Sequence, residues 1–206
     1  MKKRFLIVLT VVGLVMPALA QNNKKVEERI QLAREKYATG LENIAINKQY
    51  EEDETPAVGY TTVVRKQNWA AIGQKTDKME FYYNEIEDEM DPYPVGYALC
   101  MVRRTYNIAP RQHLEEYLFD DNGKPLFYFS RFDEVVDVPE GCSPEFEVRL
   151  YFDENGKVIR SIYKMMDENN KMKEITEKSH PEVVKELDEN VSPEFNYVKG
   201  IFDAIY

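Results

Sequence analysis

One short motif occurs twice in this chain: FDDNGK occupies 119–124 and FDENGK occupies 152–157, each between runs of apolar residues. Asn-Gly between such runs is the strongest short-range signal for a β-hairpin, because a type I′ turn needs a positive φ at both central residues. We therefore predict two hairpins, each with a two-residue loop. Hairpins of this kind are the units of an antiparallel sheet.

The register of the two predicted loops assigns side chains to the faces of the sheet. It pairs Phe119 with Leu126 and Phe152 with Ile159 across the strands. In the second copy, alternation gives one buried face and one wet face. The first copy is apolar on both faces, so we expect it in the middle of the sheet, beneath a helix or against a partner. The predicted buried face of the second copy consists of Val148, Leu150, Phe152, Ile159 and Tyr163.

A calcium loop is the alternative interpretation of the repeated motif. A loop of the EF-hand type needs a further oxygen ligand where Lys124 and Lys157 stand, and a cation at that place opposes a divalent metal. We therefore interpret the motif as a turn, in which Asp120 and Asp153 accept hydrogen bonds from the turn backbone.

An amphipathic helix is predicted from Lys24 to about Asn47. Its apolar residues follow one another at spacings of three and four, which is the stripe of a helix with one buried side. We expect this helix to pack on the sheet, with dimerisation through the stripe as the alternative. The stripe consists of Val26, Ile30, Ala33, Tyr37, Leu41 and Ile44.

The remaining pattern completes an α+β fold. An acidic linker is expected at about 47–56, and "MDPYPVG" is expected to form a turn or irregular loop between the second and third strands. Apolar stripes predict two helices near the C-terminus, after "SHPE" and "SPEF". The predicted architecture is an N-terminal helix on a curved antiparallel meander of hairpins, followed by C-terminal helices. The strands are expected at 58–66, 79–87 and 96–108 and in the two hairpins.

The first 20 residues have the features of a cleaved signal peptide. Three basic residues precede an apolar run and the small-residue end Ala18-Leu19-Ala20, so cleavage is expected before Gln21. The run is shorter than a typical membrane span, which makes a retained anchor the weaker interpretation. No Cys follows the small residues, so a lipid anchor is not indicated. We expect residues 21–206 to form a single domain, without a membrane span, in the periplasm or outside the cell.

The charge of the chain disfavours nucleic acid as a partner. The formal net charge is −10, and loss of a leader with three basic and no acidic residues lowers it to −13. A surface of that sign repels phosphate backbones.

Motifs of known catalytic chemistry are not found. The sequence lacks a Gly-x-Ser-x-Gly elbow, a glycine-rich phosphate loop and a dinucleotide fingerprint. His113 and His180 are the only histidines and have no metal-ligand spacing. We predict no catalytic residues, no cofactor and no metal.

The two cysteines are expected to form a disulfide, because an even number of cysteines in an oxidising compartment is more often paired than free. Cys100 lies in a predicted strand and Cys142 in a turn-like segment. A buried free Cys100 and a catalytic thiol are the alternatives.

Aromatic residues are unusually dense around the first hairpin. The favoured interpretation is that a curved sheet under helices needs large side chains in its core, and the alternative is a binding surface for a protein, a peptide or a glycan. The proposed surface consists of Tyr117, Phe127, Tyr128, Phe129 and Arg131.

The stretch RRTYNIAPRQHLEEYLFDDNGKPLFYFSRF at 103–132, with a leader ending in ALAQ, resembles small secreted or periplasmic bacterial proteins with paired Asn-Gly hairpins. That resemblance implies an exported, sheet-rich scaffold and no catalytic residues. A helix before a meander is also similar to cystatin-like and nuclear-transport-factor-like curled sheets, at the level of fold only.

The function expected from the sequence is a non-enzymatic secreted or periplasmic binding module. The first alternative is an envelope-associated hydrolase that uses carboxylates or Cys100. The second is a structural subunit that assembles through the N-terminal helix.

Overall fold

The computed structural model describes the backbone of residues 2–50, 59–70, 73–108, 111–133 and 142–206. Side chains are described from residue 23 onward within these ranges, except for those of 92 and 142–144.

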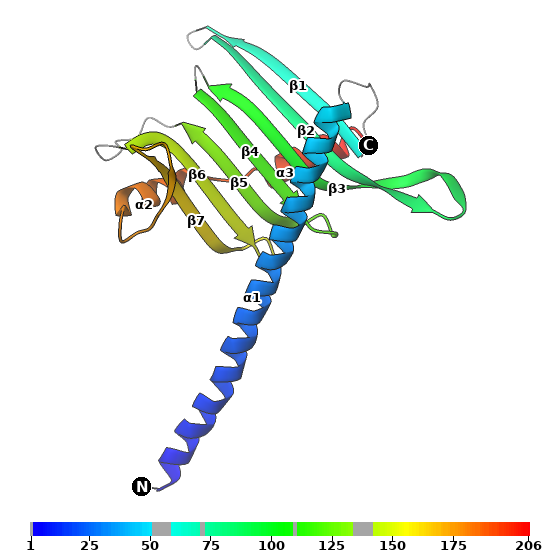
Figure 1. Cartoon of the computed structure of the whole chain (residues 1–206). Helices are drawn as coiled ribbons and strands as arrows, with labels where there is room; N and C mark the ends of the chain where they lie inside the picture. The colour runs from blue at the N-terminus through cyan, green and yellow to red at the C-terminus, as the bar shows by residue number, and fades with distance from the viewer. Residues whose placement is uncertain (1, 51–58, 71–72, 109–110, 134–141) are drawn as a thin grey trace.

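A single antiparallel sheet of eight strands forms the centre of the molecule, with the strands in sequence order (Figure 1). No ladder within the described ranges joins β1 to β8, so the sheet is open. The α+β meander predicted from the sequence is confirmed. The turn expected at "MDPYPVG" is centred on Glu89 and Met90, and the residues after it belong to β3, which begins at Asp91 and pairs irregularly with β2 there. The strands are β1 (Gly59–Trp69), β2 (Gly73–Asp88), β3 (Asp91–Ile108), β4 (Arg111–Phe119), β5 (Pro125–Asp133), β6 (Cys142–Phe152), β7 (Val158–Asp167) and β8 (Met172–Ile175).

Helices cover both faces of the sheet. Helix α1 (Lys2–Tyr50) crosses one face, while α2 (Pro181–Asn190) and α3 (Phe195–Asp203) lie on the other (Figure 1). The sheet therefore has two layers of core side chains. The layer beneath α1 includes Ile30, Ala33, Ile44, Met101, Leu118, Leu126, Phe127 and Tyr151. The layer beneath α2 and α3 includes Phe81, Val102, Tyr117, Phe119, Phe146, Val148, Val184, Leu187, Phe195, Val198 and Phe202.

Most of the apolar stripe of α1 packs on the sheet of the same chain, as predicted. Ile30, Ala33 and Ile44 are almost completely buried, whereas Leu41 is exposed. Gly40 allows a close approach, because a Cβ at this position would lie 2.5 Å from the sulfur of Met101. The acidic linker expected at 47–56 is helical as far as Tyr50, and its remainder lies outside the described residues.

Arg29 connects α1 to both predicted hairpins. Its guanidinium forms an ion pair with the Asp120 carboxylate, with a distance of 2.9 Å between Nη2 and Oδ2. It also donates to the backbone carbonyls of Pro125, at 3.2 Å, and of Phe152, at 3.1 Å. Because these carbonyls belong to two neighbouring hairpins, one side chain fixes the position of the helix along the sheet.

Both Asn-Gly hairpins are present, but the expected turn type is wrong. The Gly123 amide donates to the Asp120 carbonyl at 2.8 Å, and only Gly123, at φ 69°, has a positive φ in this loop. A turn of this kind ends in a bulge and contains more residues than a type I′ loop. The bulge shifts only the pair next to the turn, where Phe119 lies opposite Pro125, and from Leu118 and Phe127 onward the strands keep the predicted register.

The same shift occurs in the second hairpin, where Phe152 lies opposite Val158. Ile159 consequently packs beneath α1, on the face opposite to the one predicted. The wet face expected for this hairpin is also covered by α1, where Tyr151 is buried.

Each aspartate of the repeated motif holds its turn through two backbone hydrogen bonds, as predicted. Asp120 Oδ1 accepts from the amides two and four residues ahead, at 2.9 and 3.0 Å. Asp153 Oδ1 does the same at 2.8 and 2.9 Å. These bonds, together with Arg29 for Asp120, lower the pKa of both carboxyls against the effect of burial. The motif is therefore structural in both copies.

A third copy of this turn joins β7 to β8, and the sequence analysis missed it. Asp167 Oδ1 accepts from the amides of Asn169 and Lys171, both at 2.9 Å. Asn170 takes the place of the glycine, with φ 57°. Asparagine is one of the few residues that tolerate this left-handed conformation, so DENNK folds as DENGK does.

The contacts of the third turn lead us to expect an unusually low pKa for the Asp167 carboxyl. The hydrogen bond from Lys173, followed by those from the turn amides, lowers the pKa of Asp167 to about 2. Its stabilising effect is complete above the ordinary aspartate pKa and is lost as the pH falls through about 2. We expect an NMR titration of the Asp167 carboxyl carbon to give a midpoint near 2 and Lys173→Met to raise it. A wild-type midpoint at the ordinary aspartate value would contradict this account.

Candidate functional site

The aromatic side chains proposed as a binding surface are buried, which corrects that prediction. Tyr117 is 0%, Phe127 4%, Tyr128 3% and Phe129 7% exposed. They lie in β4 and β5, in the middle of the sheet, where one face is beneath α1 and the other beneath the C-terminal helices. The interpretation that the sequence favoured, a core of large side chains, describes them. Arg131 is exposed and forms an ion pair with Glu147.

The predicted disulfide is not seen. The Cys100 thiol is free, and the side chain of Cys142 lies outside the described residues. Strands β4 and β5 lie between the strands that carry the two cysteines. Burial raises the pKa of the Cys100 thiol, which favours the unreactive protonated form. Lys36 of α1 is among its charged neighbours, so the thiol is on the α1 side of the sheet.

A cavity of about 500 Å³ lies on the opposite face, between the sheet and α2. We call it the sheet cavity. A volume of this size is typical of sites for small organic ligands. Alternate residues of β3, β4 and β5 point into it, because strand side chains alternate between faces. Its floor includes Arg104, Tyr106, His113, Glu115, Tyr128, Ser130 and Phe132, and α2 contributes Val183, Glu186, Leu187 and Asn190.

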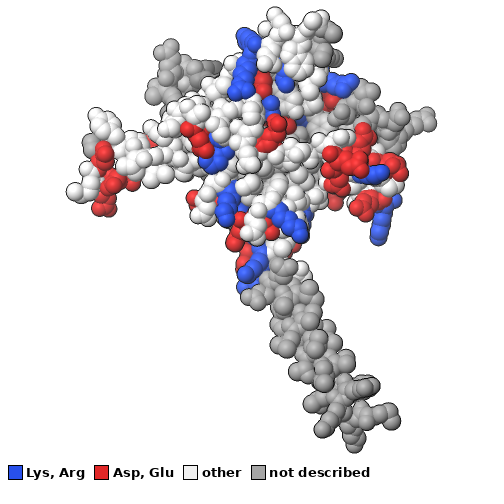
Figure 2. Space-filling model, turned by 180° about the vertical axis from the view of Figure 1, so that it is seen from behind, with Lys and Arg blue, Asp and Glu red and all other residues white. Residues whose placement is uncertain are grey.

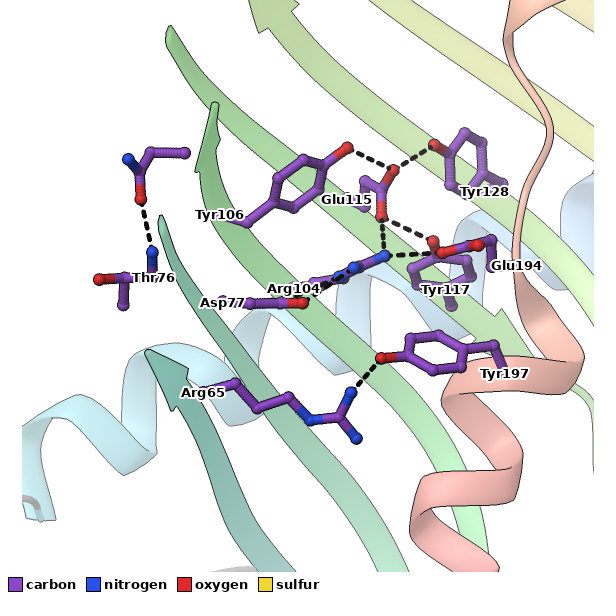
Figure 3. Close-up of polar contacts among 11 residues, drawn as sticks. Arg65, Thr76, Asp77, Arg104, Tyr106, Glu115, Tyr117, Tyr128, Glu194 and Tyr197 are labelled. Atoms are coloured by element: carbon purple, nitrogen blue, oxygen red, sulfur yellow. Dashed lines mark hydrogen bonds and ion pairs between the residues drawn. The ribbon is translucent and has the colours of Figure 1, made fainter. Parts of the chain in front are cut away.

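Arg104 is the central charge of the cavity floor (Figure 3). Only 7% of the residue is exposed. Its guanidinium binds the Asp77 carboxylate through two hydrogen bonds of 3.0 and 2.9 Å, which is the bidentate geometry of strong arginine–carboxylate pairs. Burial alone would lower the pKa of Arg104, but the contacts with Asp77 and Glu115 raise it, so the side chain stays charged.

Arg104 also connects the sheet to the C-terminal segment. Its Nη1 lies 2.9 Å from a carboxylate oxygen of Glu194 and 3.3 Å from one of Glu115. Glu194 is the residue immediately before α3. The buried arginine therefore fixes the segment that bounds the cavity on the helix side.

Glu115 accepts hydrogen bonds from three tyrosines (Figure 3). The hydroxyl of Tyr117 donates at 2.7 Å, that of Tyr106 at 3.2 Å and that of Tyr128 at 3.3 Å. Burial and the nearby Glu115 carboxylate raise the pKa of all three phenols. They therefore remain protonated donors, and the carboxylate is held by four groups.

Three parallel rings form one end of the cavity floor. Tyr106 and His113 stack at 4.7 Å with 6° between their planes, and His113 and Phe132 stack at 5.9 Å with 7° between theirs. The three residues lie opposite one another in the ladder of β3, β4 and β5. Because the ring faces are turned toward each other, the cavity meets the edges of the rings and not their faces.

Charges of both signs border the remaining space. Lys75 lines the cavity from β2, with its ammonium 5.3 Å from the ring centroids of Trp69 and Tyr106. Glu186 lines it from α2. Within the described ranges, no group of three His, Cys, Asp or Glu side chains is arranged to hold a metal ion. The cavity is therefore suited to a ligand that carries both donors and acceptors.

Sequence reasoning did not find the sheet cavity, because its carboxylates are three among 37 acidic residues. A usable signal was the alternation of side chains along each strand. Arg104 and Tyr106 lie two and four residues after Val102, so all three share one face of β3, and Glu115 shares a face of β4 with Tyr117. Charged residues in phase with buried ones indicate an internal polar network.

Comparison of the chain with protein-family models, curated proteins and solved structures finds no match.

Proposed function

We propose that this protein is an exported, non-enzymatic binding module whose ligand site is the sheet cavity. The observation that supports this proposal is the composition of the cavity, which combines about 500 Å³ of space with charges of both signs and ring edges. Binding sites of small ligands typically combine an apolar lining with a few fixed polar groups.

A short peptide is the ligand class that this lining favours among the protein, peptide and glycan partners that the sequence indicated. The Lys75 ammonium can pair with a carboxylate, and the Glu186 carboxylate with an amine or an amide donor. Glycans bind best to exposed ring faces, whereas Tyr106, His113 and Phe132 cover one another's faces. A peptide supplies donors, acceptors and both charges within a small volume.

Export rests on the sequence of the first 20 residues and on the resemblance to secreted bacterial proteins. In the described part of the chain, no helix is long and apolar enough to span a membrane. We propose the periplasm or the extracellular space as the site of action of residues 21–206.

The hydrolase alternative receives no specific support from the geometry. Cys100 has a raised pKa and lies on the face opposite to His113. Glu115 is held by Arg104 and by tyrosine hydroxyls, which favours a fixed structural charge. A subunit that assembles through the helical stripe is likewise not favoured, because Ile30, Ala33 and Ile44 are buried against the sheet.

The proposal is tested with a set of Gly-X-Gly tripeptides and with chitotriose, added separately to ¹⁵N-labelled residues 21–206. We expect tripeptides to shift the amide resonances of Ser130 and Asn190. We expect Lys75→Met and Glu186→Gln each to weaken tripeptide binding at least fivefold. Glu189→Gln, on the same helix but outside the cavity, is the matched control and is expected to change nothing.

The other outcomes are informative as well. Binding of chitotriose without any tripeptide would replace the peptide with a glycan as the ligand. Resonance shifts that are insensitive to Lys75→Met and Glu186→Gln would place binding outside the cavity. No shift with either probe would overturn the cavity as a site for these ligand classes.

A further inference from the structure

The hairpin of β2 and β3 extends beyond the rest of the sheet. The pairing of β1 with β2 ends at Tyr83, and the pairing of β4 with β3 reaches only Met101. Residues 84–97 therefore form a two-stranded projection, which we call the arm. Figure 1 shows it leaving the sheet on the side away from α2, and in Figure 2 it projects at the left.

The arm exposes large apolar side chains. Met90 is 92%, Tyr93 76%, Val95 56% and Ile86 46% exposed. Exposed apolar residues that occur singly need no explanation, but several on one short projection indicate a contact surface.

The arm adjoins an aromatic cluster of the main body. Tyr93 and Val95 precede Tyr97 in β3, in a stretch whose register with β2 is irregular. Tyr97 in turn contacts Tyr206, with ring centroids 4.3 Å apart, and Tyr83, at 5.3 Å. The exposed apolar row of the arm, Tyr93 and Val95, thus adjoins along the chain an aromatic cluster that includes the C-terminal residue.

The arm also carries a strong and uncompensated negative charge. The sequence of 84–97, NEIEDEMDPYPVGY, contains five acidic residues and no basic one. Glu85 lies directly opposite Tyr97 in the ladder, so acidic and aromatic groups share a face. Figure 2 shows acidic side chains at the end of the projection. The acidic residues alone would be a solvated surface, and it is the exposed apolar row beside them that indicates a partner.

We propose that the arm is the docking surface for a basic, apolar segment of a second protein. Lysine and arginine side chains stack on tyrosine rings and pair with carboxylates, so this one chemistry satisfies both features of the arm. An anionic membrane surface is disfavoured by charge repulsion.

Recognition occurs through side chains rather than by strand addition. The β3 edge of the arm contains Pro92 and Pro94, which have no amide hydrogen to donate to a new strand. The charged residues along the β2 edge also disfavour pairing with an added strand, because charged side chains on an edge oppose its approach. The inference goes beyond the ligand of the sheet cavity, since the two surfaces share no residue.

The test titrates residues 21–206 into a fluorescently labelled twelve-residue peptide of alternating Lys and Phe, and the fluorescence anisotropy of the peptide is the readout. Neutralising the arm with Glu85→Gln, Glu87→Gln and Asp91→Asn is expected to raise the Kd at least tenfold and to reduce its salt dependence. The matched control neutralises three exposed acids elsewhere and is expected to change the Kd less than twofold. The control variant carries Glu177→Gln, Glu182→Gln and Glu189→Gln.

A second variant separates docking from general attraction to an acidic protein. Tyr93→Ser combined with Val95→Ser keeps every charge and is expected to raise the Kd for the Lys-Phe probe at least fivefold. An equal loss of affinity in the arm and control variants would overturn the proposal, as would an unchanged Kd in the serine variant. Sedimentation that shows arm-dependent dimers would identify a second copy, and not a basic partner, as the occupant. These arm variants leave the sheet cavity intact, so they are expected to bind tripeptides as the wild type does. The arm proposal and the cavity proposal can therefore fail independently of each other.

Discussion

Replacing Arg104 with methionine is expected to lower the free energy of unfolding by about 3–5 kcal/mol, because it leaves buried carboxylates without their cation. Asp77 is 7% exposed, and it is bound to the arginine through both carboxylate oxygens. Removal of one partner of a buried ion pair is strongly destabilising even where the pair itself contributes little net stability. Urea denaturation of the wild type and the variant measures the difference.

Two further variants make this result specific. Arg104→Lys keeps the charge but loses the planar bidentate geometry, so its destabilisation should be intermediate. Arg160→Met removes an arginine from an ion pair with Glu27 that is largely exposed, and it should change stability by less than about 1 kcal/mol. Equal free energies of unfolding for Arg104→Met and the wild type would show that the carboxylates around Arg104 do not need its positive charge for stability.

Phe127→Ala is expected to lower the free energy of unfolding by a similar amount, about 3–5 kcal/mol. The ring lies between α1 and the sheet, with its centroid 5.0 Å from those of Tyr37 and Tyr151. Truncation at such a place removes buried apolar surface and leaves a cavity that the rigid sheet cannot close. Thermal and urea denaturation followed by circular dichroism measure the change.

Tyr93→Ala is the matched control for Phe127→Ala, since it removes a similar ring from the exposed arm. Its effect should stay within about 0.5 kcal/mol. The pair also distinguishes the two interpretations of aromatic density that the sequence allowed. If Phe127→Ala left stability unchanged and Tyr93→Ala destabilised the protein, the assignment of core and surface would be reversed.

The sequence predicted the fold better than the site. The helical stripe, the strand regions and the hairpins follow from local patterns of apolar residues, and local patterns were enough to obtain an α+β meander. The register of both hairpins was predicted correctly beyond the pair next to the turn. The turn type was wrong, because the sequence DNGK is compatible with more than one turn and only the backbone φ of Asn122 distinguishes them. The third turn was missed because Asn170 replaces the glycine on which recognition depended.

The sheet cavity depends on long-range contacts that no local pattern specifies. Glu194 reaches Arg104 across 90 residues of sequence, and Glu115 is one of many carboxylates until the ladder places it among three tyrosines. Whether an aromatic side chain is exposed or buried also depends on long-range contacts. Phe127 and Tyr93 are both aromatic residues of the observed strands, and only the helix that covers one of them makes it part of the core.

The sequence order of the strands has a consequence for how this protein folds. Every ladder joins strands that are neighbours in the chain, so each hairpin can close over a short loop as soon as its second strand is available. Helix α1 is different, because the contacts of Arg29 lie with Asp120 and Phe152, far along the chain. The helix precedes the strands in the sequence, but its contacts with Asp120 and Phe152 can form only when the strands up to β6 have paired. We therefore expect docking of α1 to be a late, separate step in refolding.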